Sequence, residues 1–254
     1  AKLVFKKTWI AALAMGMMTF DGMHFVQTRI ATIDVFGVFF IILMYLFMYK
    51  YYTMNFYKDK LSKTFIPLGL CGLAFGLGAA SKWICLYAAL GLAILLFYTL
   101  YKRFDEYIYA KKHIEETSGE QREQYQHIID VFGKYTTYTL LFCVGFFVII
   151  PAVIYVASYA YYVPHNQHLG YLEAVIENQE YMLSYHSGLS ADTHPYRSSW
   201  YTWPVIARPT WYYNASLLPA GSAGTIAAFG SPIVWIGALI GTIAACIQGV
   251  IDRK

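Results

Sequence analysis

Residues 30–49 read I-A-T-I-D-V-F-G-V-F-F-I-I-L-M-Y-L-F-M-Y, with Asp34 as the single charged residue. A helix needs about 20 apolar residues to cross the hydrocarbon core of a bilayer, and this stretch has that length. The same measure, applied outward in both directions, finds five more apolar stretches. The six candidate spans are residues 8–20 (extended to 25 if the helix continues across Asp21), 30–49, 64–80, 83–101, 137–162 and 232–251. The sequence therefore predicts an all-α polytopic membrane protein with about six transmembrane helices.

Composition supports the same fold class. The 254 residues are 58% hydrophobic and only 13% charged, whereas a soluble domain carries about 25% charged residues. The four cysteines all fall in apolar spans without a C-x-x-C pair, which excludes a disulfide framework or a zinc site as the basis of the fold. Within the spans, Gly69, Gly72, Gly76 and Gly78 are spaced for close helix–helix contact, and Pro151 predicts a kink in span 137–162.

The basic residues predict the orientation in the membrane. Of 19 Lys and Arg residues, 15 lie in the terminal segments and alternate loops on one side, which the positive-inside rule makes cytoplasmic. The long charged loop 102–135 lies on that side and is expected to be a solvated helical connector. The other long connection, 163–231, is expected on the outer face, with a helix over 171–185 lying along the membrane surface. The expected organisation is thus 1–162 (five spans), 163–231 (outer loop) and 232–254 (last span).

An aromatic stretch in the outer loop is the first candidate for function. Residues 194–214 read H-P-Y-R-S-S-W-Y-T-W-P-V-I-A-R-P-T-W-Y-Y-N. Trp and Tyr next to Arg are the side chains that anchor a loop at the membrane interface, but they also stack on sugar rings and bind phosphate. Composition alone leaves both interpretations open. The segment's candidate site residues are His194, Pro195, Tyr196, Trp200, Tyr201 and Trp203.

Few positive charges are expected on the outer face. They are Arg29, Lys82, Arg197 and Arg208, the candidates for binding an anionic lipid head group, although Lys82 could also simply extend to the membrane surface. Asp34 follows Arg29 by five residues and is expected about one helical turn inside the membrane, as a structural or site residue. Asp21 is the acidic residue nearest to Arg29 on this face. The scattered histidines of the outer loop do not have the spacing of a metal site, so no metal is predicted.

Three runs together resemble the bacterial protein O-mannosyltransferases, polyprenyl-phosphate-sugar-dependent glycosyltransferases of the GT-C type. They are F-D-G-M-H-F-V-Q-T-R-I-A-T-I-D (residues 20–34), G-A-A-S-K-W-I-C-L-Y (78–87) and H-P-Y-R-S-S-W-Y-T-W-P with R-P-T-W-Y-Y (194–213). Cys85 stands where the family usually has Gly. The resemblance implies a partial GT-C fold in the plasma membrane, active on the outer face.

That resemblance also implies a reaction. Mannose passes with inversion from a polyprenyl-phosphate-mannose donor to a Ser or Thr hydroxyl of an acceptor protein, with no metal or other cofactor implied. Arg29 matches the family's Arg, with Lys82 and Arg197 as helpers at the donor phosphate, while Trp200, Tyr201 and Trp203 line the sugar or acceptor channel.

The family's general base, in an outer Asp-Glu pair, belongs to a segment upstream of this sequence. Asp21 is therefore only a substitute candidate for the base, and we expect the chain to be a middle portion that is inactive alone. The alternative is a non-catalytic membrane protein that binds lipid head groups or a partner subunit through its aromatic loop. The sequence predicts no nucleic-acid partner and leaves the sugar, a protein or lipid acceptor, and the oligomeric state open.

Overall fold

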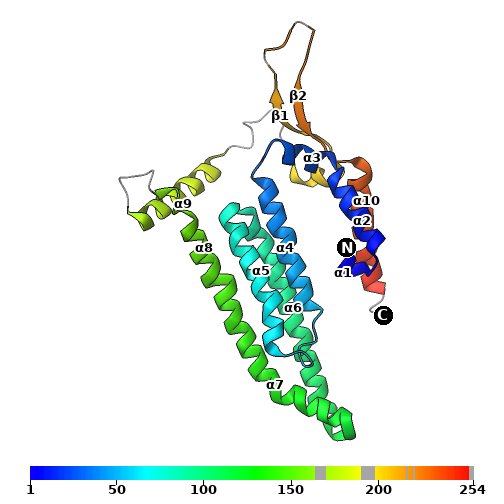
Figure 1. The fold of residues 1–254 in the computed structure, drawn as a ribbon. Helices are drawn as coiled ribbons and strands as arrows, with labels where there is room; N and C mark the ends of the chain where they lie inside the picture. The colour runs from blue at the N-terminus through cyan, green and yellow to red at the C-terminus, as the bar shows by residue number, and fades with distance from the viewer. Residues whose placement is uncertain (164–169, 190–197, 216, 220, 252–254) are drawn as a thin grey trace. The chain divides into compact units, whose positions relative to one another are not determined.

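A computed structural model describes residues 1–163, 170–189, 198–215, 217–219 and 221–251 (Figure 1). The chain forms two compact units, one made of Ala1–Val35 with Ser184–Lys254 and the other of Phe36–Leu183. This division differs from the expected boundaries at 163 and 232, because the first helices pack with the aromatic loop and the last helix.

The unit Phe36–Leu183 is a helix bundle. Its helices are α4 (Asp34–Tyr52), α5 (Leu61–Ser81), α6 (Ile84–His113), α7 (Gly119–Val144) and α8 (Ile150–Ser158). They correspond to the predicted spans 30–49, 64–80, 83–101 and 137–162, and α4 and α6 present many exposed apolar side chains, as helices facing lipid do. The central helix is α5, in whose apolar window 61% of the residues are buried.

Glycine residues on α5 allow the neighbouring helices to pack closely around it. A side chain at Gly72 would place its Cβ 2.3 Å from the Phe146 carbonyl oxygen, and one at Gly76 would lie 3.0 Å from Cα of Pro151. Gly69 and Gly78 are similarly close to side chains of neighbouring helices. The predicted use of these glycines in close helix contacts is therefore confirmed.

Pro151 distorts the span that carries it. The helix continues from α7 into a π-helical turn, η2 (Gly145–Ile149), before α8 begins. Pro has no N–H and its ring crowds the carbonyl of residue 147, so the turn before it widens instead of keeping regular α-helical bonds. The proline effect predicted from the sequence thus takes the form of a π-helical turn, and Gly72 of α5 lies against its backbone.

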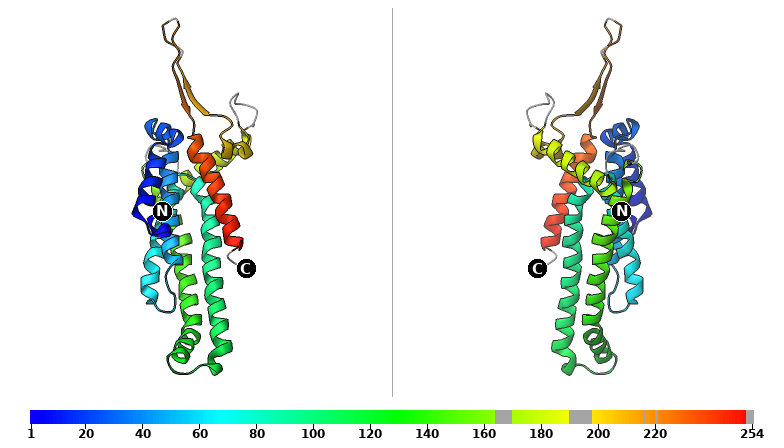
Figure 2. Two further views of the ribbon diagram at one scale, coloured as in Figure 1. Left: turned by 90° about the vertical axis from the view of Figure 1, so that its right-hand side faces the viewer. Right: turned by 90° about the vertical axis from the view of Figure 1, so that its left-hand side faces the viewer.

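At one end of this unit α6 and α7 extend beyond the apolar spans as an antiparallel pair (Figure 2). A single 3₁₀ turn, η1 (Ile114–Glu116), joins them. The predicted helical connector over 102–135 is confirmed. Rings from both helices hold the pair together, with Tyr107 stacked on Phe132 at 4.4 Å between centroids.

Helix α9 (Tyr171–Gly188) confirms the helix predicted over 171–185. Within the bundle unit it contacts the end of α8, where the Tyr159 hydroxyl accepts hydrogen bonds from Asn178 and Gln179, both at 2.7 Å. Leu172, Ile176 and Leu183 are exposed on α9. Its predicted position along the membrane surface stays a prediction.

The other unit is built from both ends of the chain. It contains α1 (Lys2–Phe5), α2 (Thr8–Thr19), α3 (Gly22–Arg29), η4 (Trp200–Val205), β1 (Thr210–Asn214), β2 (Thr225–Ala228) and α10 (Pro232–Ile251). The last span was predicted as 232–251, and α10 has those bounds. The antiparallel hairpin of β1 and β2, with an irregularity between Trp211 and Tyr213, was not predicted.

The first candidate span is not a continuous helix. Helices α2 and α3 meet at an angle of 59°, so the chain does not continue across Asp21 as one straight helix, and whether the pair forms one span stays a prediction. Among the described residues, five helices are long and apolar enough to cross a membrane, or six if this bent pair forms one span. The prediction of a polytopic, mainly helical membrane protein is confirmed.

Candidate functional site

The site begins at the break between α2 and α3. Asp21 has extended backbone angles and accepts a hydrogen bond on Oδ1 from the backbone N–H of His24 at 3.2 Å. This is the N-cap interaction that satisfies a free donor at a helix start. An aspartate in an otherwise apolar stretch thus ends one helix and starts the next.

The second carboxylate oxygen of Asp21 ties α3 to the start of α10. Its Oδ2 accepts from the backbone N–H of Ser231 at 2.8 Å and from Nε1 of Trp235 at 3.1 Å. Gly22 makes this approach possible, since a Cβ there would lie 2.5 Å from the Phe229 carbonyl oxygen. Asp21 is only 6% exposed.

With three N–H donors on its two oxygens, Asp21 has the surroundings of a structural residue. A general base for an acceptor hydroxyl must have an oxygen within reach of that hydroxyl. The geometry therefore favours a structural role for Asp21, and its catalytic role stays an untested prediction.

Helix α3 is also attached to the hairpin. Gln27 Nε2 donates to the Tyr212 hydroxyl at 3.2 Å, and α3 packs on β2, where Ala228 is fully buried. The helix is thus held near both of its ends, at Asp21 and at Gln27. Its position relative to the aromatic loop is fixed within this unit.

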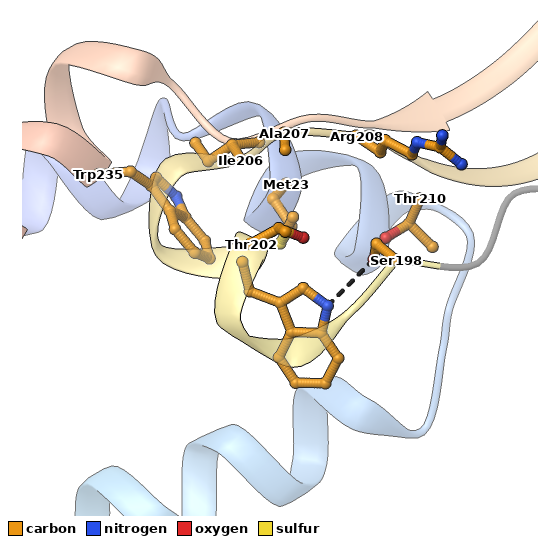
Figure 3. Close-up of a pocket in the computed structure, with 9 residues that line it drawn as sticks. Met23, Ser198, Thr202, Ile206, Ala207, Arg208, Thr210 and Trp235 are labelled. Carbon is orange, nitrogen blue, oxygen red and sulfur yellow. Dashed lines mark hydrogen bonds between the residues drawn. The ribbon is translucent and has the colours of Figure 1, made fainter. Parts of the chain in front are cut away.

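A small pocket lies where α3, the aromatic loop and α10 meet (Figure 3). Its volume is about 170 Å³. The lining residues come from three parts of the chain: Met23 from α3, Ser198, Thr202, Trp203, Ile206, Ala207, Arg208 and Thr210 from the aromatic loop, and Trp235 from α10. Pockets for drug-sized ligands measure about 300–1,000 Å³, so this one suits only the small polar end of a larger ligand.

The local conformation of the aromatic loop forms the pocket wall. The six residues of η4 include Pro204, and the turn ends at Ile206, which has left-handed backbone angles (φ 51°) and a buried side chain. Trp203 Nε1 donates to the Ser198 hydroxyl at 3.0 Å, which sets the orientation of the indole. An indole face, hydroxyl groups and one guanidinium are the groups that bind a sugar and an adjacent phosphate.

The predicted aromatic residues divide into two groups. All three aromatic residues of η4 are exposed, but Trp203, at 59%, borders the pocket, whereas Trp200 and Tyr201, at 74% and 66%, are not among its lining residues. His194, Pro195 and Tyr196 lie outside the described residues. Met23 and Trp235 were missed by the sequence reasoning, although Trp235 near the start of an apolar span has the pattern of an interfacial aromatic residue.

Of the predicted outer cations that the structure describes, Arg208 is the one that lines the pocket. Arg29 is exposed at the end of α3, with its guanidinium carbon 4.9 Å from the centre of the Phe25 ring. Lys82 belongs to the bundle unit, in the extended connection after α5, and Arg197 lies outside the described residues. A common cluster of all four therefore stays a prediction.

The expected geometry of Arg29 and Asp34 is corrected. They do not share a helix, because Ala31 has left-handed backbone angles (φ 54°) between the end of α3 and the start of α4. Asp34 is the first residue of α4 instead of lying one turn inside it, a position where a carboxylate interacts favourably with the helix dipole.

Among the described residues, no group of three or more His, Cys, Asp and Glu side chains could hold a metal ion. Independence from metal stays a prediction. The groups that the pocket offers are hydroxyls, indoles and a guanidinium.

Comparison with protein families covers nearly the whole chain. A family model described as dolichyl-phosphate-mannose-protein mannosyltransferase matches residues 1–169. A second model, the C-terminal four-transmembrane region of protein O-mannosyltransferase, matches residues 171–252. Searches of curated proteins and of solved structures gave no match.

Proposed function

We propose that this chain, which belongs to the protein O-mannosyltransferase family, takes mannose from a polyprenyl-phosphate-mannose donor and transfers it to Ser or Thr hydroxyls. Mannosyl transfer to proteins is the activity of the family. The donor, the hydroxyl acceptor and the outer-face orientation are our proposal. It includes no divalent metal.

The observation that carries the proposal is the pocket beside η4. Trp203, Arg208 and three hydroxyl residues, Ser198, Thr202 and Thr210, border a space of about 170 Å³. A mannosyl phosphate has a sugar ring with an apolar face, several hydroxyls and an adjacent negative charge, and each finds a complementary group here. The proposal assigns the sugar to Trp203 and the phosphate to Arg208.

In the reaction, the acceptor oxygen bonds to C1 of mannose as the bond from C1 to the phosphate oxygen breaks. The hydroxyl proton goes to a carboxylate base, for which we assign no residue of this chain, and lipid phosphate leaves with the electrons of the broken bond. Negative charge grows on that phosphate in the transition state, so a guanidinium placed beside it accelerates transfer. Arg208 has this role in the proposal, and Arg29 is the second candidate.

A matched pair of tryptophans tests the proposal. In the intact enzyme, Trp203→Ala should lower kcat/KM by about tenfold or more, equivalent to about 1.4 kcal/mol of transition-state stabilisation. Trp200→Ala, three residues earlier on the same turn but not among the lining residues of the pocket, should leave kcat/KM within about twofold of wild type. The assay follows transfer of radiolabelled mannose from the lipid-linked donor to a Ser/Thr peptide. Equal activities of the two variants would overturn the assignment of the sugar to Trp203.

The alternative of a non-catalytic binding function has its own supporting observation. Trp200 and Tyr201 are exposed side by side on η4, with ring centroids 6.0 Å apart, as expected of an anchor in the lipid interface. In that case Trp200→Ala would weaken the attachment of the loop to vesicles, measured by tryptophan quenching with brominated lipids. No mannosyl transfer by the intact wild-type protein would then favour binding as its function.

A further inference from the structure

The bundle unit contains a buried arginine that the proposed reaction does not use. Arg103 lies on α6 and is 4% exposed. Its guanidinium carbon lies 4.6 Å from the centre of the Tyr51 ring and 4.0 Å from that of Phe56. Cation–π contacts of this kind offset part of the cost of burying the charge, but the rings carry no compensating negative charge.

The hydrogen bonds of Arg103 are incomplete. Nη1 donates to the Tyr51 hydroxyl at 2.5 Å, whereas Nη2 is buried and has no hydrogen-bond partner in the described part of the chain. The buried hydroxyl of Thr139 on α7 lies close to the same Tyr51 hydroxyl. A buried donor without an acceptor destabilises the folded state, and a charged donor does so more strongly. An acceptor oxygen at this place would therefore be stabilising.

A cavity of about 180 Å³ adjoins this arginine. Its walls are the turn that follows α4, residues 52–56, and Thr99, Lys102, Arg103 and Glu106 of α6. The charges of Lys102, Arg103 and Glu106 sum to +1, and Lys102 Nζ is held 5.3 Å from the centre of the Tyr52 ring. Two adjacent cationic residues, each with its charge against an aromatic ring, thus line a space that can hold one phosphate group.

Hydrogen bonds fix the turn beside this cavity. The Asn55 side-chain oxygen accepts from the backbone N–H groups of Tyr57 and Lys58, and the Asp59 carboxylate accepts from that of Asn55. The Tyr57 hydroxyl donates to the Arg103 carbonyl at 2.6 Å. Burial, and secondarily the charge of Glu106, raise the pKa of Tyr57, so the hydroxyl stays a donor at neutral pH. The cavity is therefore organised before any ligand enters.

We propose that Arg103 and Lys102 bind a phosphate group in this cavity, at the end of the bundle predicted to be cytoplasmic. Guanidinium and ammonium groups beside unsatisfied N–H donors recognise phosphate oxygens. The phosphate comes either from the head group of an anionic lipid in that leaflet or from free inorganic phosphate. This site belongs to the bundle unit and does not depend on the proposed transfer reaction.

Ligand-dependent thermal unfolding of the purified full chain in detergent tests the proposal, because a ligand that binds the folded state raises the unfolding temperature. The probes are dioctanoyl phosphatidylglycerol, inorganic phosphate and, as the neutral control, dioctanoyl phosphatidylcholine. The wild type should respond to phosphatidylglycerol or phosphate and not to phosphatidylcholine. A response to the lipid alone assigns the site to a head group, and a response to phosphate assigns it to the free anion.

Variants distinguish binding at this site from nonspecific attraction of anions to the charged surface. Lys102→Gln changes an exposed side chain and should weaken binding about tenfold or more, as should Arg103→Lys, which keeps the charge but loses the planar guanidinium. Arg122→Gln, an exposed arginine on α7, should bind as the wild type does. The proposal is overturned if the wild type responds to neither anionic probe, or if Lys102→Gln and Arg103→Lys both bind as tightly as Arg122→Gln. The role of Arg103 would then be limited to the structural contact between α6 and Tyr51 of α4.

Discussion

At the scale of single residues, Asp21 connects parts of the chain that are far apart in sequence. Its carboxylate caps α3 through His24 and holds the start of α10 through Ser231 and Trp235. Trp235 also lines the pocket, and so does Met23, two residues after Asp21. Asp21 therefore positions two walls of the candidate site without being among the residues that line it.

Replacing Asp21 distinguishes this role from catalysis. Asp21→Ala removes a helix cap and leaves two N–H donors without an acceptor, so it should lower the free energy of unfolding by about 2–4 kcal/mol. Asp105→Ala, at an exposed position on α6, should change it by less than about 0.5 kcal/mol. Denaturant or thermal unfolding in detergent measures both variants.

The activity of Asp21→Asn completes this test. Asn keeps one acceptor oxygen, which can serve Ser231 and Trp235, while its NH2 group replaces the oxygen that accepts from His24. The variant should therefore be less stable than the wild type but fold and retain most of the transfer activity of the intact enzyme. Loss of a general base typically lowers the rate about 10²–10⁴-fold. A loss of that size in a variant that is still folded at the assay temperature would show that Asp21 is catalytic.

At the scale of elements, the contact of α5 with α8 and the π-helical turn organises the bundle. The turn forms because Pro151 disrupts regular helical hydrogen bonding, and Gly72 lets α5 approach the Phe146 carbonyl. A proline on one helix and a glycine on another thus fit together. Gly76 extends the contact to Pro151 itself.

A pair of glycine substitutions tests this contact. Gly72→Ala should destabilise the protein by about 1–3 kcal/mol, because its methyl group would collide with backbone atoms that cannot rotate away. Gly133→Ala on α7 meets no atom within 4 Å and should be neutral or stabilise by up to about 1 kcal/mol, owing to the higher helix propensity of Ala. Thermal unfolding midpoints of the two variants give the comparison. Similar midpoints would argue against tight α5–η2 packing.

At the scale of the whole molecule, the exposed apolar surface of each unit indicates a membrane environment. In the described part of the chain, no residue in the apolar window of α10 is buried, and an apolar helix of this length without covering side chains is stable only in lipid or against further helices. In the bundle unit, 61% of the apolar window of α5 is buried, whereas only 17% of that of α6 and 11% of that of the span formed by α7 and α8 are buried. The unequal distribution of Lys and Arg then predicts the orientation.

Cysteine accessibility measures that orientation. In a background without native cysteines, Ser222→Cys between the hairpin strands should react with a membrane-impermeant maleimide in intact cells. Lys112→Cys, near the α6–α7 connection, should react only after the membrane is permeabilised. The opposite pattern would reverse the predicted topology and remove the candidate pocket from the outer face.

The sequence by itself determined the membrane fold class and most span positions. A chain segment in lipid must satisfy its backbone hydrogen bonds internally, so a long apolar run such as 232–251 becomes a helix whatever surrounds it. Only tertiary structure decided the site, because its hydrogen bonds join residues about 210 positions apart, as between Asp21 and Ser231. The hairpin, the break at Ala31 and the selection of Trp203 over Trp200 likewise depend on packing partners that no local pattern identifies.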